Sequence, residues 1–177
     1  MIFCPLPGTP LITQGFGQNP DLYKQFGFLG HEGIDFGVPE GTTVYAPHDG
    51  VAKVLDEGTQ NYGLSVTIDG PTRRSQMAHL SQALVTNGQN VSQGDIIGKS
   101  GKTGMAEGPH LHWTFKLLKN GLVQHKDNGY NGAIDATEYT RLWLDQDLHR
   151  NAQYSDDAKA YLALTFTDAQ YLKRTIG

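Results

Sequence analysis

The stretch Gly108-Pro109-His110-Leu111-His112-Trp113-Thr114-Phe115 carries two histidines two residues apart, in a run that alternates between polar and apolar side chains. In a β-strand, side chains at positions i and i+2 point to the same face of the sheet. A strand here places His110, His112 and Thr114 on one face and the alternating apolar residues on the other. The stretch therefore predicts the floor of a metal or acid/base site. The alternative is a pair of surface histidines on a half-buried strand.

The composition predicts one globular domain built from short strands. The chain has 177 residues, of which 38% are hydrophobic and 18% charged, and its 22 glycines indicate many turns. A net charge of −4 provides no basic surface for nucleic acid. No apolar run approaches the ~20 residues of a membrane-spanning helix. The single cysteine, Cys4, excludes an intramolecular disulfide and is interpreted as structural.

Alternating apolar residues and turn signals divide the middle of the chain into strands. Asp49-Gly50 and Asp69-Gly70 are typical hairpin turns, so we expect one hairpin around each of them. His79 lies near the end of one of these strands, and His48 belongs to a turn and is given no chemical role. The segments expected to be strands are 42–46, 51–55, 63–68, 75–80, 95–98 and 110–118.

The two ends of the chain differ from this middle part. We expect residues 1–30 to be a lead segment packed on the domain, residues 31–130 to be the core, and residues 131–177 to be a tail. Spaced apolar residues among helix formers predict two short helices in the tail, over 136–150 and 155–166.

A second group of chemically suited residues lies in the segment 30–39, where His31 and Asp35 are four positions apart. Glu32 invites comparison with the helical zinc motif H-E-x-x-H, in which the glutamate is the base. The glycines and the proline of this segment disfavour a helix, and the fifth residue is an aspartate. Glu32 is therefore predicted to be a surface residue and not a general base.

Together these motifs offer five candidates: His31, Asp35, His79, His110 and His112. Catalytic zinc commonly takes three nitrogen or oxygen ligands and keeps a fourth position for water. Hydrolysis also needs a proton acceptor and a group that stabilises the oxyanion, and histidine serves both purposes near neutral pH. Five residues therefore suffice for three ligands and two acid/base groups.

The order H-x-x-x-D, then A-H-L-S, then G-P-H-L-H-W resembles the lysostaphin-type zinc endopeptidases of bacterial cell walls, the β-lytic metallopeptidases. The resemblance covers roughly residues 10–127. It implies a mainly β fold, in which an antiparallel sheet forms the floor of a narrow groove with loop walls, followed here by a short helical C-terminal tail.

Carried over motif by motif, the resemblance also implies roles for the five candidates. His31, Asp35 and His112 fall on the zinc ligands, and His79 and His110 fall on the histidines that flank the metal as oxyanion stabiliser and base. All five positions are filled. The histidines outside these motifs, His125 and His149, are expected to be silent.

The function implied by the resemblance is hydrolysis of peptide bonds in bacterial peptidoglycan by a zinc-activated water, with one Zn²⁺ per chain. The bond lies in a cross-bridge or a stem peptide, and we expect a monomer with no membrane insertion. The start MIFCPLPGTP has no signal peptide, which favours phage-type delivery, as a lysis enzyme or virion component, over a domain of a secreted precursor. The alternatives are a non-catalytic module that binds zinc and peptidoglycan, and an autoinhibited regulator of wall hydrolysis. The segments 46–51 and 91–98 look similar to the halves of biotinyl/lipoyl carrier domains, but the Asp49-Gly50 turn lacks the exposed lysine that such a carrier needs.

Overall fold

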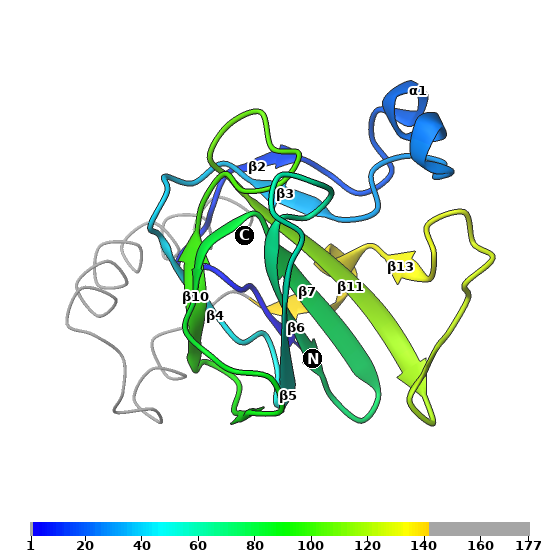
Figure 1. The fold of residues 1–177 in the computed structure, drawn as a ribbon. Coiled ribbons are helices and arrows are strands. Elements are labelled where there is room, and N and C mark those ends of the chain that lie inside the picture. Colours follow the sequence, from blue (N-terminus) through cyan, green and yellow to red (C-terminus); the bar gives the residue numbers. More distant parts are fainter. Residues whose placement is uncertain (1, 142–177) are drawn as a thin grey trace, which may run out of the picture.

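The structure, a computed structural model, describes residues 2–141 of the chain (Figure 1). Over this range the fold is mainly β, as the sequence predicts, and most strand pairs are antiparallel. The helical elements are α1 (Pro20–Tyr23) and the 3₁₀ turns η1 (Lys24–Phe26) and η2 (Ala136–Tyr139). The first strands are β1 (Ile2–Phe3), β2 (Ile12–Gln14), β3 (Ile34–Phe36), β4 (Thr43–Tyr45), β5 (Gly50–Asp56), β6 (Leu64–Asp69) and β7 (Arg73–Ala78). The later strands are β8 (Leu80–Ala83), β9 (Asn90–Val91), β10 (Ile96–Ser100), β11 (Leu111–Lys119), β12 (Leu122–Val123), β13 (Ala133–Ile134) and β14 (Thr140–Arg141).

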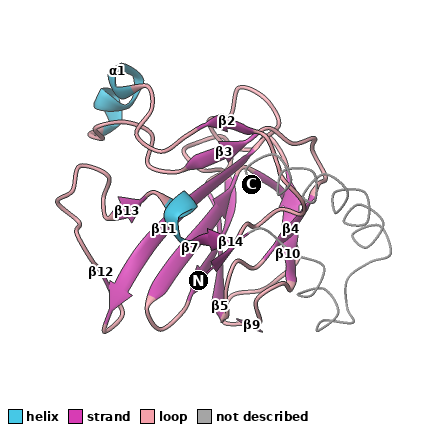
Figure 2. Cartoon of the chain, turned by 180° about the vertical axis from the view of Figure 1, so that it is seen from behind, coloured by secondary structure: helices cyan, strands magenta, loops and turns pink. Residues whose placement is uncertain are grey.

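Within the described range these strands form three sheets. The large sheet has the order β2-β3-β11-β7-β6-β5-β9, with β12 and β13 also paired to β11. A smaller sheet, β4-β10-β8, stands beside it, and β1 pairs with β14 in parallel (Figure 2). The long strand β11 therefore lies inside the large sheet, between β3 and β7.

From Leu111 onward the alternation along β11 matches the sequence prediction, whereas His110 lies just before the strand and bridges to Gly101. Leu111, Trp113 and Phe115 are fully buried and belong to the hydrophobic core. Burying an aromatic side chain of this size stabilises the fold by roughly 1.5–3 kcal/mol, so these residues fix which face of β11 points inward. His112 and Thr114 consequently point to the opposite face.

The hairpin expected at Asp69-Gly70 is confirmed, because β6 and β7 pair in antiparallel register. The hairpin expected around Asp49-Gly50 is wrong. β4 pairs with β10 in the small sheet, whereas β5 pairs with β6 in the large sheet. Pro47 follows β4 and has no N–H to donate to a ladder with β5. The backbone N–H of Ala46 instead donates to the carbonyl of Asp95, at the start of β10.

Both ends of the described range join the core. Cys4 is buried, which raises the pKa of its thiol to about 12 and suits the structural role assigned to it. The tail helix expected from residue 136 is only the 3₁₀ turn η2, and the strand β14 follows it. The rest of that helix and the helix over 155–166 lie outside the described residues. Among residues 2–141 no helix is long and apolar enough to cross a membrane.

Candidate metal centre

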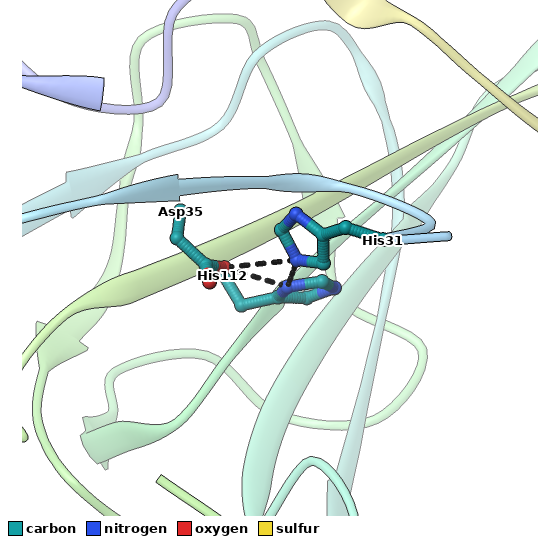
Figure 3. Close-up of side chains that lie close together, drawn as sticks. All are labelled: His31, Asp35 and His112. Carbon is teal, nitrogen blue, oxygen red and sulfur yellow. Dashed lines mark hydrogen bonds and ion pairs between the residues drawn. The ribbon is translucent and has the colours of Figure 1, made fainter. Parts of the chain in front are cut away.

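Strand pairing brings three of the five candidate residues together. β3 runs antiparallel to β11, and the register places Asp35 directly opposite His112. His31 lies in the loop just before β3 and turns its ring toward the same point (Figure 3). The short spacing from His31 to Asp35 is therefore sufficient for both side chains to meet a histidine that is 77 positions further along the chain than Asp35.

The inner atoms of these three side chains form a close triangle. His31 Nε2 is 3.0 Å from His112 Nδ1 and 3.2 Å from Asp35 Oδ1, and His112 Nδ1 is 2.8 Å from Asp35 Oδ1 (Figure 3). The donor atoms of tetrahedral zinc, bonded at 2.0–2.1 Å, are about 3.3 Å apart. Two nitrogens and a carboxylate oxygen this close together fit a metal ion with little adjustment.

In each ring the nitrogen that faces away from this triangle has a hydrogen-bond partner, which leaves the nitrogen within the triangle free to act as a ligand. His31 Nδ1 donates to the carbonyl of Gly15 at 3.2 Å, which leaves the lone pair on Nε2. His112 Nε2 contacts Thr114 Oγ1 at 2.9 Å, and when it donates there, the lone pair is on Nδ1. Such outer partners set the tautomer and orientation of metal-binding histidines. The donor set and its supports thus match a zinc site.

The carboxyl group of Asp35 is charged at neutral pH. Burial by itself raises the pKa of Asp35, but hydrogen bonds from His112 and His31 outweigh burial and hold the pKa well below its usual range. The side chain retains 14% exposure, whereas both histidine side chains are almost fully buried. The centre therefore offers one negative charge to a cation from a shielded position.

His79 and His110 lie together beside this triangle. Their ring centroids are 4.6 Å apart, and His110 Nε2 is 3.9 Å from Asp35 Oδ1. His79 Nδ1 donates to the carbonyl of Thr103 and His110 Nδ1 to that of Gly108, each at 2.8 Å. Because a carbonyl only accepts, each neutral ring must carry its proton on Nδ1 and present Nε2 as an acceptor.

The backbone at His79 changes direction to make this possible. His79 has φ of 59°, in the left-handed region that non-glycine residues rarely adopt, and it separates β7 of the large sheet from β8 of the small one. Burial, followed by the nearby His112 ring, lowers the pKa of His79 to about 4. The ring is therefore neutral at pH 7.

The prediction that Glu32 is a surface residue is wrong. Its side chain is 7% exposed, and Glu32 Oε1 accepts a hydrogen bond of 2.6 Å from the hydroxyl of Tyr62 and lies 3.6 Å from His112 Nε2. Tyr62 covers Glu32 from the loop before β6, a contact that local sequence cannot reveal. Sequence reasoning thus missed Glu32 and Tyr62 behind the metal centre, and it gave no role to Thr114 although the alternation had placed that residue on the same face.

Of the remaining histidines, His48 and His125 fall within the described residues, and neither contacts the metal centre. His48 is buried and contacts Ser75 Oγ at 3.1 Å and the carbonyl of Asp49 at 2.9 Å, which makes it part of the packing. His125 is exposed in the loop after β12. His149 lies outside the described residues.

Gly33 is a point at which backbone packing controls the metal centre. A Cβ atom there would lie 2.6 Å from His112 Cε1 and 2.7 Å from the carbonyl oxygen of Trp113. We expect Gly33→Ala to displace the His112 ring, to lower zinc affinity by roughly 10–100-fold and to destabilise the fold by about 1–3 kcal/mol. Zinc titration and thermal unfolding measure both effects. Gly108→Ala is the matched control, since its Cβ would meet nothing within 4 Å; equal effects of the two variants would contradict the prediction.

Comparison with known proteins gives a consistent family. The family model described as "Peptidase family M23" matches residues 29–127 of the chain. Among curated relatives, the peptidoglycan DD-endopeptidase ShyA of Vibrio cholerae is 46% identical over 84 residues, which is 47% of this chain and 19% of ShyA. Lysostaphin of Staphylococcus simulans is 39% identical over 105 residues, which is 56% of this chain and 20% of lysostaphin. The chain thus spans about a fifth of the length of these relatives.

Solved structures agree with this result. A zinc-containing peptidase from Vibrio cholerae aligns with a TM-score of 0.57 and 30% identity over 77% of this chain and 39% of that one. The catalytic domain of lysostaphin from Staphylococcus simulans aligns with a TM-score of 0.57 and 28% identity over 73% of this chain and 91% of that one. The matched residues 29–127 are more than half of the chain and contain all five candidate residues, and the chain belongs to the lysostaphin-type peptidase family M23.

Proposed function

We propose that this chain is a zinc-dependent endopeptidase that hydrolyses peptide bonds in bacterial peptidoglycan and acts at the cell wall. The observation that carries the proposal is the convergence of His31 Nε2, Asp35 Oδ1 and His112 Nδ1 beside a second pair of histidines. The relatives named for peptidoglycan and glycyl-glycine endopeptidase activity support the substrate class. The bond lies in a cross-bridge or in a stem peptide.

His31, Asp35 and His112 hold the metal in this proposal. When bound, zinc lowers the pKa of a coordinated water toward about 7 and polarises the carbonyl of the scissile bond. The protein supplies one negative charge through Asp35 against the two charges of the ion. The chemistry that remains is proton transfer and stabilisation of the oxyanion, which belongs to the chain's own side chains.

His110 is the base in this proposal. Its Nδ1 proton is held by Gly108, so the lone pair on Nε2 points toward the metal centre, 3.9 Å from Asp35 Oδ1. Nε2 can take a proton from the attacking water and pass it to the leaving amine. General acid–base catalysis of this kind contributes typically 10²–10⁴-fold.

His79 stabilises the oxyanion in this proposal. Its ring faces His110, and its orientation is fixed by the carbonyl of Thr103. With a proton on Nε2 as well, the ring donates to the oxygen on which negative charge develops. That charge itself favours protonation of His79, although the resting ring is neutral.

The first test is clearing of purified peptidoglycan sacculi, followed by mass spectrometry of the released fragments. We expect turbidity to fall, to stop falling on addition of a chelator, and to fall again when zinc is restored. The fragments should carry new peptide amino termini, which identify the bond. Fragments with only new sugar ends would overturn the proposed chemistry. Binding of zinc and sacculi without any release would indicate a non-catalytic module instead.

A further inference from the structure

The face of the large sheet that carries His112 continues away from the metal centre as rows of polar side chains. One row, Lys53, Thr67, Gln76 and Thr114, crosses the sheet from β5 to β11, because these residues are register partners on neighbouring strands. The next row, Asp69, Arg74 and Lys116, crosses it from β6 to β11. We call them the polar row and the charged row.

Most residues of these rows line a hollow on the same face of the sheet as His112. Its volume is about 400 Å³, and its walls include the polar row together with Arg74 and Lys116. Thr114 connects the two regions, since it lines the hollow and also contacts His112 Nε2 at 2.9 Å. An extended peptide bound at the metal centre could therefore continue over the charged row.

The charges in this hollow are not balanced. Lys53, Arg74 and Lys116 line it, and Asp69 is shared between the first two: Lys53 Nζ lies 2.7 Å from Asp69 Oδ2, and Arg74 Nη2 lies 2.9 Å from the same oxygen. Among residues 2–141, no acidic side chain forms an ion pair with Lys116. Glu32 acts on Lys116 from outside the hollow, but no acidic side chain of the described residues lines the hollow itself, so its lining has a surplus of positive charge at its β11 side.

The pairing of Lys116 with Arg74 is itself unfavourable. The two residues are directly opposite each other on β11 and β7, and like charges at such positions destabilise a sheet. Lys116 is only partly exposed, and burial, followed by the charge of Arg74, lowers the pKa of its ammonium group. A bound anion would turn this repulsion into two attractive contacts.

We propose that Lys116, with Arg74 beside it, is a subsite for a carboxylate group of the peptide substrate. This inference rests on the proposed function and narrows its substrate. Lys116 lies four positions after His112, about 13 Å along the strand. With the reach of the lysine side chain, the carboxylate belongs about two to four residues from the scissile bond, at 3.3–3.6 Å per extended residue. Stem peptides contain free carboxylates and glycine bridges contain none, so the groove selects acidic stem-type peptides.

The test compares two cross-linked peptides that differ only in one group, a carboxylate or its carboxamide. The zinc-loaded chain is measured as wild type, as Lys116→Met, as Lys116→Glu and as the control Lys119→Met, which removes an exposed lysine at the end of the same strand. We expect wild type and the control to prefer the carboxylate about 10-fold in kcat/KM, mostly through KM. Lys116→Met should lose this preference and Lys116→Glu should reverse it, both read as the ratio of kcat/KM for the two peptides.

Binding of both peptides to the chain after its metal has been removed with a chelator, measured by calorimetry, distinguishes failure of the subsite from failure of the proposed function. Equal cleavage of both peptides by wild type would overturn the subsite and leave the proposed function standing. A Lys116-dependent preference in binding, without cleavage of either peptide, would support the subsite and overturn the proposed function. A preference that persists in Lys116→Glu would also overturn the subsite.

Discussion

Asp35→Ala is expected to lose zinc and hydrolysis together. Asp35 supplies the only negative charge among the three converging side chains, and it also orients both histidines through contacts of 3.2 and 2.8 Å. Loss of an outer partner of a metal ligand already costs roughly 10–100-fold in affinity, so loss of the ligand itself should cost more than about 100-fold. The measurements are zinc titration, the metal content of the purified protein and cleavage of sacculi. His31→Ala and His112→Ala should behave in the same way.

Two further variants sharpen this prediction. Asp127→Ala removes an exposed carboxylate of a loop and should leave zinc content and cleavage unchanged. Asp35→Asn keeps the shape of the side chain but not its charge, and we expect intermediate zinc affinity. The pKa of Asp35 is lower in the folded chain than in an unfolded aspartate. The stability that its charge contributes is therefore fully present above the unfolded pKa and is lost as the pH falls through the lower folded pKa. Full zinc occupancy with normal cleavage in Asp35→Ala would show that the metal is held elsewhere.

His110→Ala is expected to keep the fold and the metal but to lose turnover by roughly 10²–10⁴-fold. His110 is not one of the converging ligands, and its side chain is 18% exposed, so its removal leaves no large cavity. The readouts are zinc content, thermal unfolding and single-turnover cleavage. His79→Ala should show the same separation of metal binding from turnover.

The matched control for His110→Ala is His125→Ala, which removes an exposed histidine and should change neither readout. Undiminished cleavage by His110→Ala would remove this residue from the mechanism. Loss of zinc in the same variant would move it into the ligand set. If His125→Ala loses activity, a site histidine has been misplaced.

The sequence by itself determined the face of β11 that carries the chemistry. The alternation from His110 to Phe115 is a local property with a period of two. The free energy gained by burying Trp113 and Phe115 favours this orientation of the strand over the opposite one, which would expose both rings. The spacing of His31 and Asp35 likewise kept two candidate ligands close together in any bent or extended segment. The mainly β character followed from glycines and turn signals.

Only the tertiary structure decided which strands are neighbours and what covers the site. The register of β3 and β11 sets Asp35 opposite His112, and these residues are 77 positions apart. Strand β4 pairs with β10 and not with β5, the next strand along the chain. The local sequence predicts that Glu32 is a surface residue. In the structure Tyr62, 30 positions away, covers Glu32 and donates a hydrogen bond to its carboxylate. Lys116 and Arg74 become a paired charge only through the register of β11 and β7. Local patterns fix the direction of a side chain, whereas its partners and its exposure depend on chain segments that sequence proximity does not identify.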